Sequence, residues 1–62
     1  MKIVILGANG QLGRELAEIL QNKFSLKLYK KKDLDITNFI AVENMIKYEK
    51  PEILINAAAY TS

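Results

Sequence analysis

Three glycines, each separated from the next by two residues, follow a short apolar run at the start of the chain, in MKIVILGANGQLGREL. The run Ile3–Leu6 is continuous and rich in β-branched residues, which is typical of a strand covered on both faces, as in parallel sheets. From Gln11 to Asn22 apolar residues recur at helical spacing. A strand that passes through a glycine-rich turn into a helix is the arrangement that binds phosphate through backbone N–H groups. No other feature of the sequence constrains the fold as much.

Two amphipathic helices are predicted from this periodicity. The second begins after an N-cap at Thr37 or Asn38 and ends near Glu49, because Pro51 cannot continue a helix and disfavours helical geometry in the residue before it. The apolar face predicted for the first helix consists of Leu12, Leu16, Ile19 and Leu20. The apolar stripe predicted for the second consists of Phe39, Val42, Met45 and Ile46.

Two further strands complete the pattern. One is predicted within Phe24–Tyr29, where apolar and polar residues alternate, and the other is the apolar run Ile53–Ile55. A polar connection, Lys30–Asn38, follows the first of them. The order strand, helix, strand, helix, strand predicts an α/β fold with a Rossmann-like parallel sheet of three strands and two helices, the first βαβαβ half of a doubly wound domain. If the third strand lies beyond the second, right-handed crossovers place both helices on one face. If it lies on the other side of the first strand, each face receives one helix.

Composition excludes several classes of function. The 62 residues allow at most one small domain, and they include neither cysteine nor histidine, so we expect no thiolate metal site and no thiol nucleophile. Missing cysteines also favour a cytoplasmic protein. The net charge of +2 is too small to indicate a nucleic-acid partner, and no apolar run is long enough to cross a membrane.

Each glycine of the turn has a predicted role. Gly7 would permit the sharp exit from the first strand, Gly10 would let a diphosphate approach the main chain, and Gly13 would let the helix pack closely. The candidate phosphate-binding residues are those of the turn and the first helical residues: Gly7, Asn9, Gly10, Gln11, Leu12 and Gly13. The alternative is an ordinary tight turn with an incidental third glycine. A P-loop is excluded because no Gly-Lys-Ser/Thr follows.

Three lysines, Lys30–Lys32, follow the predicted second strand, where nucleotide-binding folds usually place an acid that binds the adenosine ribose. The nearest acid, Asp33, lies too far past the strand end. Lysine at this place would attract a 2′-phosphate, so Lys30 is a candidate cofactor residue and NADPH is favoured over NADH. The alternative is a solvated loop.

The spacing Gly-x-x-Gly-x-x-Gly resembles the extended short-chain dehydrogenase/reductase superfamily. The three motifs GANGQLGREL, DLDIT and NAAAYT, in this order, are similar to the start of the dTDP-4-dehydrorhamnose reductase family over essentially the whole chain. This resemblance implies NADPH-dependent reduction of dTDP-4-dehydro-L-rhamnose to dTDP-L-rhamnose, with a dTDP-sugar as the partner molecule. Relatives of the family often accept NADH as well, and members have been linked to Mg²⁺.

The resemblance also implies roles for residues beyond the glycine turn. Asp35 and Ile36 resemble the family's pair that recognises adenine, the carboxylate accepting from the exocyclic amine and the backbone N–H serving a ring nitrogen. The alternative for Asp35 is a role in capping the second helix. Ala57–Ala59 resemble the stretch that lines the cofactor cleft, and their alternative is tight packing in a core or turn.

A catalytic pair is missing from the sequence. The superfamily uses Tyr-x-x-x-Lys, but Tyr29 and Tyr48 are followed four residues later by acids, and Tyr60 by the end of the chain. We therefore expect the N-terminal part of a longer enzyme, without catalytic or metal-binding residues. Its uncovered apolar surface predicts self-association. Two alternatives stay open: a non-catalytic subunit resembling methionine adenosyltransferase β, and another extended nucleotide-sugar epimerase or dehydratase.

Overall fold

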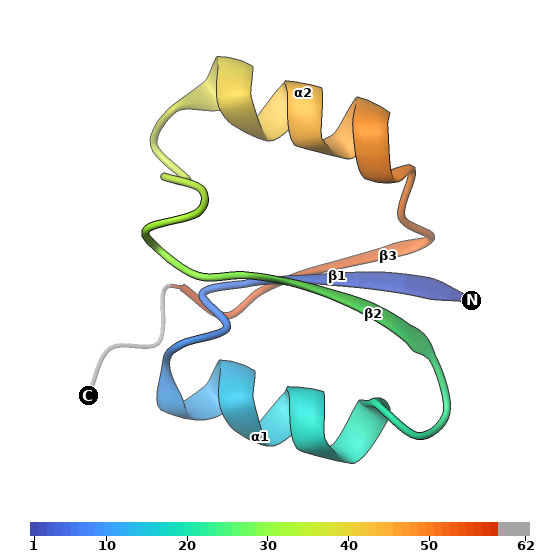
Figure 1. Cartoon of the computed structure of the whole chain (residues 1–62). Coiled ribbons are helices and arrows are strands. Elements are labelled where there is room, and N and C mark those ends of the chain that lie inside the picture. The colour runs from blue at the N-terminus through green and yellow to red at the C-terminus, as the bar shows by residue number, and fades with distance from the viewer. Residues whose placement is uncertain (59–62) are drawn as a thin grey trace.

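A computed structural model describes residues 1–58 of the chain. Its three strands are parallel and lie in the order β2-β1-β3, so the predicted Rossmann-like α/β class is confirmed, and β3 lies on the far side of β1 from β2. Figure 1 shows one helix on each face of this sheet. The elements, in chain order, are β1 (Lys2–Leu6), α1 (Gln11–Leu20), β2 (Ser25–Tyr29), α2 (Phe39–Glu49) and β3 (Ile53–Asn56).

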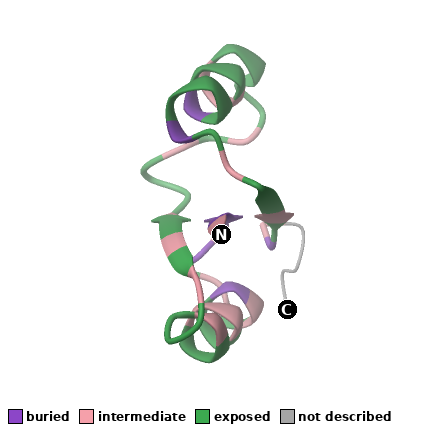
Figure 2. Cartoon of the chain, turned by 90° about the vertical axis from the view of Figure 1, so that its right-hand side faces the viewer, coloured by how far each residue is buried: buried purple, intermediate pink, exposed green. Residues whose placement is uncertain are grey.

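The central strand, β1, is buried on both faces, as its continuous apolar sequence predicts. Ile3 pairs with Leu26 of β2 and with Ile53 of β3, so β1 is hydrogen-bonded along both edges. Because successive side chains of a strand point to opposite faces, Ile3 and Ile5 pack on the α1 side, while Val4 and Leu6 pack on the α2 side. Figure 2 shows this buried strand between the two helices.

The predicted apolar face of α1 is wrong at Ile19, which is 68% exposed. The sheet-facing arc runs from Leu12 through the buried Gly13 to the half-buried Ala17. At about 100° per residue, Ile19 lies at the margin of that arc. The close approach of Gly13 therefore turns α1 so that Ala17 takes the place expected for Ile19.

The predicted stripe of α2 is also rotated. The prediction is confirmed at Met45, which is buried, but Phe39 is 80% exposed and Ile46 is 39% exposed, and the buried Glu49 was not predicted. Glu49 belongs to the buried face because Lys2 Nζ forms an ion pair with its Oε1 at 2.6 Å and Tyr29 donates a hydrogen bond to its Oε2. An apolar stripe counted from hydrophobic residues alone omits this carboxylate, and is displaced towards Phe39 as a result.

Both ends of α2 agree with the sequence. Asn38 is the N-cap: its Oδ1 accepts a hydrogen bond from the Ala41 N–H at 3.1 Å. At the other end Lys50 adopts a left-handed conformation with φ of 49°, and its N–H donates to the Ile46 carbonyl at 2.8 Å. This geometry ends the helix just before Pro51.

Two negative findings hold for the described residues. Within residues 1–58 no helix has the length and apolarity needed to span a membrane. In the same part of the chain no group of three or more potential metal-ligating side chains comes together.

Candidate functional site

The turn between β1 and α1 begins at a glycine in a left-handed conformation. Gly7 has φ of 69°, a region that residues with a Cβ rarely adopt. Its carbonyl accepts a hydrogen bond from the Gly10 N–H at 3.0 Å, which closes the turn. The chain thereby leaves the central strand sharply and enters α1 at the carboxyl edge of the sheet.

Gly13 is required by close packing. A Cβ on this residue would stand 2.5 Å from the Gly7 carbonyl oxygen and 2.7 Å from the Ala8 Cα. Both atoms belong to the backbone and cannot move aside independently. The third glycine therefore lets α1 lie directly against the turn, and the interpretation of it as incidental is wrong.

Gly10 is different, because its backbone does not demand glycine. It is the N-cap of α1, with φ of −80° and ψ of 171°, an extended conformation open to any residue. No side chain in the described part of the chain caps α1, and its first turn has no acidic residue. The helix α2, by contrast, has the Asn38 cap. The N–H groups and the positive end of the α1 dipole are thus left for another partner.

A cleft of about 280 Å³ lies where this turn meets the two connections at the carboxyl ends of the strands. We call it the strand-end cleft. The glycine turn forms one side, the β2–α2 connection another, and the residues after β3 a third. Its lining residues are Gly7, Asn9, Gly10, Lys31, Leu34, Asp35, Ile36, Thr37, Ala57 and Ala58.

Seven of the candidate residues from the sequence therefore meet in this cleft: Gly7, Asn9, Gly10, Asp35, Ile36, Ala57 and Ala58. Three other candidates do not line it: Gln11 is exposed, Leu12 packs in the core on the α1 side, and Gly13 is buried against the turn. Ala59 lies outside the described residues. Lys31, Leu34 and Thr37 were not predicted as lining residues.

Asp35 organises the connection that borders the cleft. Its Oδ1 accepts hydrogen bonds from the Thr37 hydroxyl at 2.6 Å and the Thr37 N–H at 2.9 Å. These bonds hold the pKa of the Asp35 carboxyl below its usual range, so it is ionised at neutral pH. Asn38 rather than Asp35 caps α2. The spacing Asp-x-Thr, typical of an Asx-turn, is the signal that could have pointed to Thr37.

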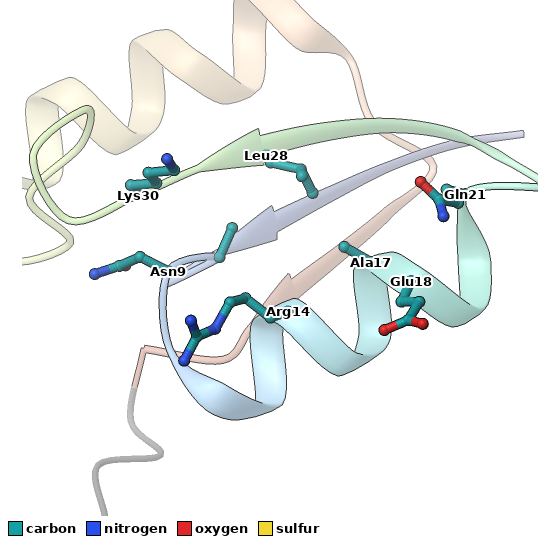
Figure 3. Close-up of a pocket in the computed structure, with 8 residues that line it drawn as sticks. Asn9, Arg14, Ala17, Glu18, Gln21, Leu28 and Lys30 are labelled. Carbon is teal, nitrogen blue, oxygen red and sulfur yellow. The ribbon is translucent and has the colours of Figure 1, made fainter.

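The lysine run divides between two cavities. The Lys31 N–H donates to Asn9 Oδ1 at 3.3 Å, which joins the β2–α2 connection to the glycine turn and brings Lys31 to the strand-end cleft. Lys30 lines a second hollow instead (Figure 3). The Lys30 N–H donates to Asp33 Oδ2 at 3.0 Å, so the Asp33 carboxylate closes its own turn and lines neither cavity. Lys32 also lines neither.

The whole chain, residues 1–62, matches the model of one protein family, described as the RmlD substrate binding domain. The chain belongs to this family. The resemblance carried by GANGQLGREL, DLDIT and NAAAYT is thereby confirmed.

Named relatives and solved structures that are similar to the chain support the same assignment. A dTDP-4-dehydrorhamnose reductase from Aggregatibacter actinomycetemcomitans is 44% identical over 63 residues, covering 98% of this chain and 21% of that protein. Crystal structures of dTDP-4-dehydrorhamnose reductases superpose closely. The Clostridium acetobutylicum protein has a TM-score of 0.87 at 46% identity, covering 92% of this chain and 21% of its own.

A second crystal structure is of the Bacillus anthracis dTDP-4-dehydrorhamnose reductase in complex with NADP. It has a TM-score of 0.89 at 42% identity, and covers 98% of this chain and 22% of its own. The chain thus spans about a fifth of the length of the RmlD-family relatives it matches.

Proposed function

We propose that this chain is the first part of the NADPH-binding Rossmann domain of a reductase that converts dTDP-4-dehydro-L-rhamnose to dTDP-L-rhamnose. The observation that carries the proposal is the uncapped start of α1, which opens on the strand-end cleft at the carboxyl edge of the parallel sheet. Open α/β sheets bind nucleotides at this edge, on a helix N-terminus. The names of the relatives, and the NADP bound to one of them, favour this function over a regulatory subunit.

The glycine turn would hold the diphosphate of the cofactor. The backbone N–H groups at the start of α1, from Gln11 and Leu12, supply donors, and the helix dipole stabilises the negative charge without a cationic side chain. Gly10 needs no glycine for its own conformation. A ligand that approaches its main chain gives a reason for the missing Cβ. Gly7 and Gly13 hold the turn in place.

The β2–α2 connection would hold the adenine. Asp35 has one carboxylate oxygen engaged by Thr37, which fixes the group in its ionised form as an acceptor for the exocyclic amine. The backbone N–H of Ile36 would serve a ring nitrogen. Ala57 and Ala58 line the cleft and offer small side chains along which the ribose and phosphates can lie; we propose the same role for Ala59, which lies outside the described residues.

The cofactor supplies the hydride for reduction of the sugar ketone. The chain's own contribution is to bind and orient the adenosine and diphosphate portion. The sequence contains no Tyr-x-x-x-Lys, so the group that protonates the developing alkoxide has to come from other residues of the enzyme.

The test is an assay of the full-length protein that contains this chain. We expect it to oxidise NADPH when dTDP-4-dehydro-L-rhamnose is added, with dTDP-L-rhamnose as the product. Calorimetric titration with NADPH in the absence of the sugar checks the cofactor site separately. If NADPH binds but only another nucleotide sugar is reduced, the proposed substrate is wrong. If NADPH does not bind, the proposed role of this chain is wrong.

A further inference from the structure

The buried carboxylate of Glu49 lies outside the strand-end cleft. Glu49 is 5% exposed, is the last residue of α2, and lines neither of the two cavities. Figure 1 shows this end of α2 on the same side of the molecule as the start of β1, whereas the glycine turn lies at the opposite side. Burial of a charge is costly unless the charge is paired, so the position of this carboxylate requires a physical reason.

Glu49 joins α2 to two strands of the sheet. Its Oε1 forms an ion pair at 2.6 Å with the Nζ of Lys2 at the start of β1, and its Oε2 accepts a hydrogen bond from the hydroxyl of Tyr29 at the end of β2. Lys2 is itself fixed, because its N–H donates to Glu52 Oε1 at 3.1 Å and its carbonyl accepts the Glu52 N–H at 2.9 Å. Both oxygens of the Glu49 carboxylate are therefore engaged by groups with defined positions.

Little apolar surface of α2 is buried against the sheet. Within residues 39–49, all of which the structure describes, Met45 and Glu49 are the only buried residues. Met45 packs with Val4 and Leu6 of the central strand. A helix with so little buried apolar surface is easily displaced, so the polar contacts of Glu49 contribute strongly to the position of α2.

Tyr29 connects these contacts to the strand-end cleft. Its backbone carbonyl accepts a hydrogen bond from the Ala8 N–H of the glycine turn at 3.1 Å. Its side chain packs, with Leu34 and Ile36 of the β2–α2 connection, against the core on the α2 side. Tyr29 precedes the connection and α2 follows it, so the Glu49 carboxylate holds the elements at both ends of the connection.

We propose that Glu49, through Lys2 and Tyr29, positions the β2–α2 connection for binding the adenine of NADPH. This inference rests on the proposed function and adds three positioning residues, none of which lines the cleft. With their contacts intact, Asp35 and Ile36 keep their places at the cleft. Without them, α2 and the connection occupy other positions for part of the time, and the apparent affinity falls with the fraction of molecules in the binding arrangement.

The test measures nucleotide affinity and turnover in variants of the full-length protein. For Glu49→Gln, which removes the charge but little volume, we expect the dissociation constant of NADPH to rise by about 5- to 20-fold, while kcat at saturating NADPH changes less than about twofold. Lys2→Gln should have the same effect, and Lys2→Arg, which keeps the positive charge, should restore most of the affinity. Glu43→Gln is the matched control on the same helix, since the Glu43 side chain is 69% exposed, and should change neither quantity.

Competition with two fragments separates positioning from a general loss of structure. In Glu49→Gln, 5′-AMP, which carries the adenine, should lose affinity by the same factor as NADPH, whereas inorganic pyrophosphate, the probe for the glycine turn, should not. Equal losses for both fragments, or a kcat that falls as far as the affinity, would overturn the positioning role.

A second variant covers the case in which Glu49→Gln does not fold. Tyr29→Phe removes only the hydroxyl that donates to Glu49, and should weaken NADPH and 5′-AMP binding in the same direction. Unchanged NADPH affinity in a folded variant would overturn this inference while leaving the proposed function standing. A wild-type protein that does not bind NADPH would overturn both.

Discussion

Gly7 and Ala58 approach so closely that a Cβ on Gly7 would stand 2.5 Å from the Ala58 Cα and 2.6 Å from its backbone nitrogen. The contact joins the exit of β1 to the residues that follow β3. It involves backbone atoms on the Ala58 side, which cannot rotate away as a side chain could. Two sides of the strand-end cleft therefore meet at Gly7, where the space is too small for any side chain.

Gly7→Ala should destabilise the protein. The substitution forces a left-handed conformation on alanine and places its methyl group against the Ala58 backbone. We expect the free energy of unfolding to fall by about 2 kcal/mol or more from strain and overpacking together. Urea denaturation of the full-length protein measures the loss. An unchanged urea midpoint would show that the residues after β1 and β3 can move apart to make room for the methyl group.

Gly10→Ser should separate stability from binding. Serine is a favourable N-cap, and the backbone of Gly10 is extended, so we expect stability to stay within about 0.5 kcal/mol of wild type or to rise. The same hydroxyl would occupy the N–H groups that we propose for the diphosphate, so affinity for both NADPH and NADH should fall at least about 10-fold. Calorimetric titration with each nucleotide checks this. Wild-type affinity in this variant would argue against diphosphate binding at the turn.

The buried Glu49 should make stability fall in acid. The Lys2 ion pair, followed by the hydrogen bond from Tyr29, holds the pKa of the Glu49 carboxyl below its ordinary value of 4.5. A carboxyl with a lowered folded-state pKa contributes stability above that ordinary value, and the contribution is lost as the pH falls through the folded-state pKa.

Urea midpoints measured from pH 7 down to about 3 should therefore decline less steeply in Glu49→Gln than in wild type. Glu43→Gln is the matched control, because the Glu43 side chain is 69% exposed. Its ion pair with Lys47 Nζ, at 3.7 Å, is a surface pair that adds little stability. If all three proteins have the same acid profile, the ion pair with Lys2 does not stabilise the fold.

The Tyr29 hydroxyl should ionise at a higher pH than that of an ordinary tyrosine. The hydrogen bond that its hydroxyl donates to Glu49, followed by burial, raises the pKa of Tyr29 from 10.0 to about 12. Its contribution to stability is complete below pH 10.0 and is lost as the pH rises through the raised value. Ultraviolet titration should show a late-ionising tyrosine in wild type that is missing in Tyr29→Phe. If the wild-type and Tyr29→Phe titrations are indistinguishable above pH 10.0, the result contradicts the hydrogen bond to Glu49.

The 62-residue chain by itself should self-associate. Both β2 and β3 are edge strands, and Ile53 and Leu54 of β3 remain 41% and 40% exposed. Phe39 and Ile40 add apolar surface at the start of α2, with 80% and 74% exposed. Open sheet edges with apolar side chains favour association. Sedimentation velocity should show mass that increases with concentration. A monomer that unfolds cooperatively at all concentrations would refute this expectation.

The order and bounds of the elements could be predicted because they depend on local signals. The continuous run Ile3–Leu6 indicated a strand buried on both faces, and the candidate caps Thr37 and Asn38 and the stop before Pro51 bounded α2. The position of β3 could not be chosen from sequence, since both orders allow right-handed crossovers. On α2, the burial of Met45 was predicted, but that of Glu49 was missed because its partners, Lys2 and Tyr29, lie far away in the sequence.

The candidate site was predictable where a backbone requirement is visible in the sequence. The spacing of Gly7 and Gly13 reflects close approaches that the structure shows directly. The division of the lysines was not predictable, because it depends on the bond between the Lys31 N–H and Asn9 Oδ1, which joins residues far apart in the sequence. Consecutive residues of similar chemistry are distinguished only by such contacts.

At the proposed site, the uncapped start of α1 would also couple nucleotide binding to the stability of this helix. Amides that the chain leaves without a side-chain acceptor are hydrogen-bonded to water until an anion binds, so binding of the nucleotide would also suppress fraying of the first turn. Deuterium uptake at Gln11 and Leu12 would then slow on addition of nucleotide far more than uptake at the start of α2, which carries its own cap.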